Sequence, residues 1–78
     1  MSHLLTKDDF KERGIILSPQ ELRCVELASH DMPVKNMSDK MSIAEGTINK
    51  YMQTARQKLH VSTTAGAVAI ALRRKWIE

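Results

Sequence analysis

The clearest folding signal in this 78-residue chain is the stretch VKNMSDKMSIAEGTINKYMQTARQKL, residues 34–59. Its first part has the spacing of a short amphipathic helix that begins near Pro33, with inward positions at Val34, Met37, Ser38 and Met41. Its second part carries the buried stripe of a longer helix, at Ile48, Met52, Ala55 and Leu59. Because Ile43 opens a turn two residues after the first pattern ends, the stretch predicts two helices joined by a tight turn.

The ends of the longer helix are marked by two local signals. Ser42 with Glu45 three residues later forms a candidate capping box, which would move the helix start up to two residues upstream of residue 44. His60 follows the last apolar position and predicts the end of the helix. We therefore expect this helix to occupy about residues 44–59.

A third helix is predicted upstream by the segment Leu17-Ser18-Pro19-Gln20-Glu21-Leu22. It combines a capping box of Ser18 and Glu21, a proline at the first helical position and a possible staple between Leu17 and Leu22. This helix should run to about Ser29, with Cys24 on its apolar face as a small buried hydrophobe rather than a reactive thiol. The segment 1–17 is expected to be a leader or linker with a short helix over residues 6–13, and residues 18–78 to form the domain.

The last predicted helix begins at residues 62–64 and is apolar on nearly every side from Ala65 to Leu72. A helix of this kind at the edge of a small domain cannot bury all its faces against one neighbour. We expect one group to pack inward, namely Val68, Ala71 and Leu72. The remaining apolar positions are expected to be covered by a second copy of the chain; these positions are Ala65, Ala69 and Ile70. The alternative is that the leader, through Phe10, Ile15 and Ile16, covers that face within one chain.

A chain of 78 residues is long enough for only one small domain. Aromatic residues are few, 4 % of the total, and the net charge is +3. The charge is uneven: residues 1–43 carry six basic and seven acidic side chains, whereas residues 44–78 carry six basic and two acidic ones. A localised basic surface attracts phosphate polymers, although Arg73-Arg74-Lys75 would also favour the end of a helix without any ligand. No apolar run is long enough to cross a membrane, and the single cysteine and the absence of an export signal predict a cytoplasmic protein.

The sequence predicts neither an enzyme nor a metal or cofactor site. His3, His30 and His60 have no metal-ligand spacing among themselves or with Cys24. A glycine-rich phosphate loop and a nucleophile with its base are both missing from the sequence. Catalysis is therefore not the expected activity.

The layout of a short helix, a tight turn and a longer helix is that of a helix-turn-helix DNA reader. The outer arc of the longer helix is polar and basic rather than acidic. Asn49 and Gln53 can make bidentate hydrogen bonds to adenine, and Lys50 can donate to guanine. Glu45 on the same arc can accept from the amino group of cytosine or stabilise the helix end. The pattern favours sequence-specific contact with double-stranded DNA.

The chain resembles the LuxR-type helix-turn-helix family from residue 17 to about residue 77. The resemblance rests on these segments: Ser18-Pro19-Gln20-Glu21, Met37-Ser38, Met41, Ile43, Glu45-Gly46-Thr47-Ile48, Lys58-Leu59-His60-Val61 and Ala67-Val68-Ala69. It implies a four-helix all-α transcription regulator that binds two-fold-related DNA as a dimer through its last helix, and it leaves open a contact with RNA polymerase. It also implies that Asn49, Lys50 and Gln53 face bases.

The resemblance supports two further groups of candidate residues. Structural or phosphate-facing positions, to which we add Arg56, are Thr47, Lys58, Thr63 and Thr64. The dimer contact is expected to involve Ala65, Ala69, Ile70 and Arg73. The sequence departs from the family pattern by lacking glycine at Asp31 and His60, serine at Ala44, histidine at Tyr51, a bulky aliphatic residue at Ala55 and arginine at Thr64. Asp31 and His60 are therefore expected at left-handed helix exits.

Two other functions compete with DNA reading. A protein-interaction module on the same scaffold would dimerise with another regulator and modulate it, and would share the apolar last helix. It would not need Asn49, Lys50 and Gln53, which therefore favour DNA. A promoter-reading domain like those of sigma factors would lack the Ala67-Val68-Ala69 helix.

Overall fold

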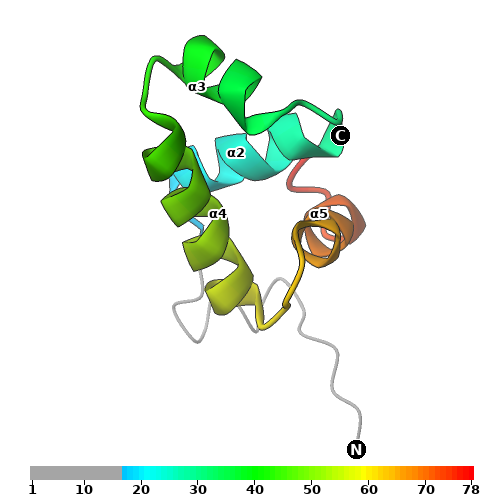
Figure 1. Cartoon of the computed structure of the whole chain (residues 1–78). Coiled ribbons are helices and arrows are strands. Elements are labelled where there is room, and N and C mark those ends of the chain that lie inside the picture. Colours follow the sequence, from blue (N-terminus) through cyan, green and yellow to red (C-terminus); the bar gives the residue numbers. More distant parts are fainter. Residues whose placement is uncertain (1–16) are drawn as a thin grey trace, which may run out of the picture.

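The computed structural model describes residues 17–78, which form four helices and no strand. The helices are α2 (Pro19–Ser29), α3 (Val34–Met41), α4 (Glu45–Leu59) and α5 (Thr64–Arg73). Figure 1 shows α2 in the centre, with α3 above it and α4 and α5 on either side. The predicted all-α four-helix architecture is confirmed. The expected leader helix over residues 6–13, and with it Phe10, Ile15 and Ile16, lies outside the described residues.

Helix α2 begins with the capping box that the sequence predicts. The Ser18 Oγ accepts a hydrogen bond from the Glu21 N–H at 3.1 Å, and the Glu21 Oε1 accepts one from the Ser18 N–H at 2.8 Å. Pro19 occupies the first helical position, where its missing N–H leaves no hydrogen bond unmade. The start of α2 is thus fixed by local chemistry, and its last residue, Ser29, agrees with the predicted end.

All four described helices are followed by a non-glycine residue in the left-handed conformation, at Asp31, Ser42, His60 and Lys75. In each case the next residue donates its N–H back to a carbonyl five positions earlier. The four pairs are Met32 to Leu27, Ile43 to Ser38, Val61 to Arg56 and Trp76 to Ala71. These bonds satisfy carbonyls that the last helical turn would leave unpaired. The expected left-handed exits at Asp31 and His60 are confirmed.

Ser42 does not cap α4, contrary to the capping box expected with Glu45. It ends α3 at a φ of 57°, and an N-cap residue needs extended backbone instead. Ala44 supplies that extended backbone without a side-chain hydrogen bond, and α4 begins at Glu45. The turn between α3 and α4 is stabilised by a side chain of α3, since the Ser38 Oγ donates a hydrogen bond to the Ile43 carbonyl.

The core lies where α2, α4 and α5 meet, with α3 packed against α4. The fully buried side chains of largest volume are Ile48, Leu59, Val25 and Cys24. All four predicted stripe positions of α4 are buried. The C-terminal segment adds Ile77, which is 5 % exposed although it follows the last helix.

Helix α5 is rotated relative to the expected orientation. Ala71 is fully buried, as expected, and so is Ala67, whereas Leu72, also expected to point inward, is 45 % exposed. Ala67 and Ala71 lie one turn apart and let α5 pack close to its neighbours. With these two alanines facing the core, Leu72, the residue after Ala71, is turned toward the surface. Val68 is half-buried against the core. Within residues 17–78 no helix is both long and apolar enough to span a bilayer.

Candidate nucleic-acid interface

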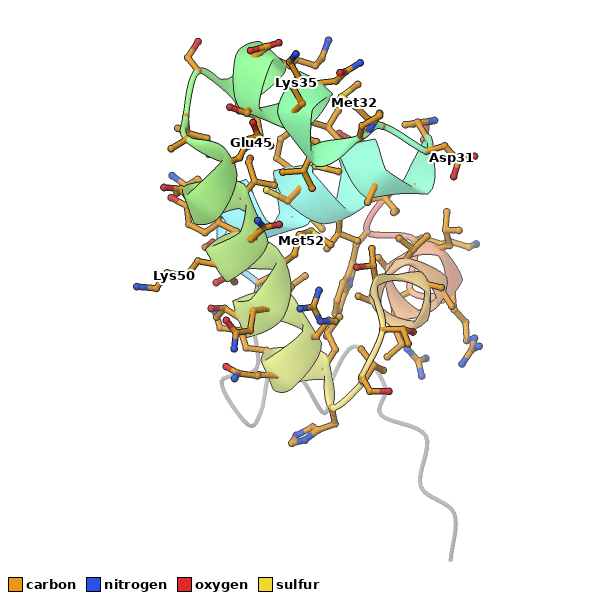
Figure 2. The ribbon with its side chains drawn as sticks, in the orientation of Figure 1. Asp31, Met32, Lys35, Glu45, Lys50 and Met52 are labelled. Atoms are coloured by element: carbon orange, nitrogen blue, oxygen red, sulfur yellow. The ribbon has the colours of Figure 1, made fainter. Side chains whose placement is uncertain are left out.

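Helix α4 has two opposite faces, one apolar and buried, the other polar and exposed. The exposed positions of the helix are Glu45, Gly46, Asn49, Lys50, Gln53 and Gln57. Figure 2 shows Lys50 extending away from the body of the domain, while Met52 points toward the interior. The four residues predicted to read bases therefore lie together on one open face of a helix whose other face is held by the core.

The side chains of Asn49, Lys50 and Gln53 make no hydrogen bond or ion pair with any residue in the described part of the chain. Their donors and acceptors are left to solvent or to a ligand. A polar side chain that is neither buried nor engaged in the fold adds little to stability. This face of α4 is consequently available for recognition.

The far end of α4 is tied to α2 by an ion pair that the sequence did not reveal. The Lys58 Nζ lies 2.8 Å from the Glu21 Oε1, and the Glu21 side chain is 7 % exposed against 35 % for Lys58. Burial by itself raises the pKa of Glu21. The hydrogen bonds from Lys58 and Ser18, with the charge of Lys58, outweigh burial and hold the pKa below its ordinary value. Glu21 is therefore ionised near neutral pH, and it joins the first turn of α2 to the last turn of α4.

Three of the four remaining predicted phosphate contacts lie around the junction of α4 and α5, and the fourth, Thr47, lies at the other end of α4. The Arg56 Nη1 donates to the Thr64 Oγ1 at 3.3 Å, and the Thr63 Oγ1 caps α5 by accepting from the Gly66 N–H at 3.0 Å. Thr47 is half-buried in the first turn of α4. Four of the five predicted phosphate-facing residues thus have partners inside the domain, and their role toward DNA stays a prediction.

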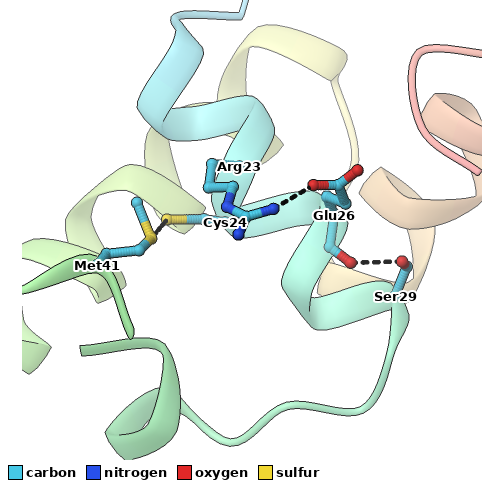
Figure 3. Close-up of polar contacts among 5 residues, drawn as sticks. All are labelled: Arg23, Cys24, Glu26, Ser29 and Met41. Atoms are coloured by element: carbon cyan, nitrogen blue, oxygen red, sulfur yellow. Dashed lines mark hydrogen bonds and ion pairs between the residues drawn. The ribbon is translucent and has the colours of Figure 1, made fainter. Parts of the chain in front are cut away.

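Cys24 is a buried core residue, as expected. Figure 3 shows its Sγ directed at the Met41 Sδ, at 3.8 Å, and on the same helix the exposed pair of Arg23 and Glu26 at 2.6 Å. Burial, with a smaller contribution from the nearby Glu21 charge, raises the pKa of the Cys24 thiol. The thiol therefore stays protonated. Residues 17–78 contain no group of three or more His, Cys, Asp or Glu placed to hold a metal ion.

The whole of this arrangement falls within a family match. Residues 15–71 match the model of the bacterial regulatory proteins of the luxR family. The chain belongs to this family. The resemblance predicted from the sequence is thereby confirmed, and the luxR-family match includes α2, α3, α4 and most of α5.

Two relatives show what kind of protein carries such a luxR-family domain. The transcriptional activator protein RaiR of Rhizobium etli is 35 % identical over 49 residues, which are 63 % of this chain and 20 % of RaiR. The quorum sensing-dependent transcriptional regulator VjbR of Brucella ovis is 35 % identical over 57 residues, which are 73 % of this chain and 22 % of VjbR. The chain thus corresponds to about a fifth of the length of each relative.

Proposed function

We propose that this luxR-family domain binds double-stranded DNA sequence-specifically as part of a transcription regulator, with α4 in the major groove. The observation that carries the proposal is the open face of α4, where Asn49, Lys50 and Gln53 are exposed and unengaged. These side chains match the hydrogen-bonding groups that adenine and guanine present in that groove. Residues 44–78, which include α4, also carry all of the excess positive charge.

In this proposal the first two turns of α4 enter the groove, as the reading helix does in helix-turn-helix proteins. Glu45 and Asn49 lie toward its N-terminal end, and Gln53 lies further along the same face. Arg56 with Thr64, and Thr63 beside them, would contact phosphates where α5 begins. Lys58 would add its positive charge to these contacts with the DNA phosphates while it remains paired with Glu21.

We also propose that the domain acts as a homodimer through α5, on DNA sites related by a two-fold axis. Ala65, Ala69 and Arg73 are exposed on α5, and Ile70 is half-buried. Leu72, the one large hydrophobic side chain exposed in residues 17–78, lies on this helix as well. A second copy would cover the apolar surface that the fold of one chain leaves open. Contact with RNA polymerase stays an expectation without an assigned surface.

Binding to duplex DNA is expected to weaken steeply as salt is raised. Each phosphate that the domain neutralises releases counterions and contributes about −0.9 to the slope of log affinity against log salt concentration. A fluorescence-anisotropy titration of labelled duplex at several salt concentrations measures this slope. A complex whose affinity does not respond to salt would contradict the proposed phosphate contacts.

Replacing Ala69 by glutamate is expected to prevent dimerisation without unfolding the monomer. Ala69 is exposed, whereas Ile70 packs partly against the core and would confound the result. Sedimentation velocity should show the wild type shifting toward a dimer with concentration and Ala69→Glu remaining a monomer. Gln20→Glu, an exposed change on α2, serves as the charge control. If Ala69→Glu associates as strongly as the wild type, the dimer contact does not lie on this face of α5.

A further inference from the structure

The two glycines in the described part of the chain have opposite surroundings. A methyl group added at Gly66 would lie 3.1 Å from the Val61 Cβ and 3.2 Å from the Thr63 Oγ1, so both neighbours would have to shift slightly to admit it. A methyl group added at Gly46 would have no neighbour within 4 Å. The packing of the domain therefore explains Gly66 and does not explain Gly46.

Backbone conformation does not explain Gly46 either. The residue is the second of α4, and its φ lies outside the left-handed range that favours glycine. An exposed helical position with open space around it is occupied more favourably by alanine than by glycine, because glycine loses more backbone entropy on folding. The isolated domain would therefore be at least as stable with a side chain at residue 46.

The position of Gly46 on α4 suggests what the bare backbone is for. With a helical period of 3.6 residues, Gly46 lies on the same line as Lys50, Gln53 and Gln57, at the centre of the exposed face. Gly46 is thus the one place on that line where the surface of α4 is reduced to backbone. It lies one turn before Asn49 and Lys50.

The dimensions of DNA leave little free space around a reading helix. An α-helix with its side chains is about 10–12 Å across, and the major groove of B-form DNA is about 12 Å wide. A side chain at the deepest point of entry would hold the helix away from the base edges. Glycine occurs where a backbone must approach a ligand closely.

We propose that Gly46 is a positioning residue for base recognition: its missing side chain lets the first turn of α4 sit deep enough for Asn49 and Lys50 to reach base edges. This inference rests on the proposed DNA-binding function. It adds that one residue, Gly46, determines how deeply α4 enters the major groove. It commits to duplex DNA as the ligand. A protein partner on the same face would place no comparable limit on a methyl group there.

The test compares Gly46→Ala with the wild-type chain in affinity for a duplex that the wild type has enriched from a random pool. Gly46→Ala should bind this duplex about tenfold more weakly or worse, the loss expected when one bidentate base contact is withdrawn. Its midpoint of thermal unfolding should equal or exceed that of the wild type. Gly46→Leu should lose more affinity than Gly46→Ala, because the longer side chain holds the helix further out.

Gly66→Ala is the matched control, since the same methyl group is added to a glycine near a helix start. Its unfolding midpoint should fall, because Val61 and Thr63 must move. If Gly46→Ala binds the enriched duplex as tightly as the wild type, the inference is wrong and the proposed function stands. A lowered unfolding midpoint for Gly46→Ala would also overturn it, since the fold would then need the glycine. If the wild type binds no duplex, the proposed function fails and the inference fails with it.

Discussion

Replacing Asn49 and Lys50 together by alanine should remove most of the preference of the domain for its own DNA site. A good bidentate contact discriminates against the wrong base by roughly 1–3 kcal/mol, so two contacts account for roughly 2–6 kcal/mol if they add. Both side chains are exposed and unengaged within the described residues, so the unfolding transition should change little. The loss should therefore appear in binding and not in stability.

The matched control is the adjacent pair Lys35 and Asn36, which carries the same two residue types on the exposed surface of α3. Lys35→Ala/Asn36→Ala removes the same charge and the same amide, but it should leave base preference intact. Affinities are compared on the preferred duplex and on a scrambled duplex of equal length. If Asn49→Ala/Lys50→Ala loses affinity equally on both, these residues contact the phosphate backbone and do not read bases.

Replacing Lys58 by methionine should lower the free energy of unfolding at pH 7 by about 2 kcal/mol. Removing one partner of a buried ion pair typically costs roughly 3–5 kcal/mol, because the other charge is left buried and unpaired. The expected loss is smaller here because Lys58 is 35 % exposed, and because Glu21 keeps its hydrogen bond from the Ser18 N–H. Urea denaturation followed by circular dichroism measures the change.

The cost of Lys58→Met should depend on pH. Because the pKa of Glu21 is lower in the folded protein than its ordinary value of 4.5, the ion pair contributes its full stability above that value. This contribution disappears as the pH falls through the folded-state pKa and Glu21 is protonated. The difference between wild type and Lys58→Met should therefore be largest near neutral pH and shrink in acid.

The exposed pair of Arg23 and Glu26 supplies the control for this experiment. Their side chains are 45 % and 37 % exposed, and surface pairs of this kind contribute about 0–1 kcal/mol. Arg23→Met should consequently change stability little at any pH. A loss for Lys58→Met that is as small as that for Arg23→Met would mean that Glu21 is adequately solvated without its partner.

The features predicted correctly are those that neighbouring residues determine. Ser18, Pro19 and Glu21 lie within one turn, and the cap they form needs no information from elsewhere in the chain. The left-handed exits at Asp31 and His60 were predicted on another basis, because the family that the chain resembles usually has glycine at these two positions. The buried stripe of α4 was predicted because the helical period alone fixes which residues share a face.

The features missed depend on how helices meet. Glu21 and Lys58 are far apart in the sequence, and their ion pair exists because α2 and α4 cross near those residues. The inward face of α5 was predicted only in part: Ala71 is buried as expected, but nearly every position is apolar, and only the packing selects Ala67 over Leu72. Ser42 was predicted to cap α4, but Ser42 ends α3 in the left-handed conformation, and an N-cap residue needs extended backbone.

For the candidate site, the sequence placed Glu45, Asn49, Lys50 and Gln53 on one helix face, and the structure leaves that face open. The resemblance left a structural role open for Lys58, but the partners of Lys58 and Arg56 within the domain, Glu21 and Thr64, were not predicted. A basic residue near a helix end has the same sequence signature whether it pairs with a phosphate or with a carboxylate from another helix.

Whether α4 reads DNA is tested by selecting duplex DNA from a random pool with the full 78-residue chain and footprinting the enriched sequences. We expect enrichment of a defined sequence arranged as two half-sites related by a two-fold axis, with major-groove protection in each half. Asn49→Ala/Lys50→Ala should fail to enrich that sequence. Repeated selection that enriches no sequence, with binding indifferent to the duplex offered, would contradict the claim that α4 of this domain reads DNA.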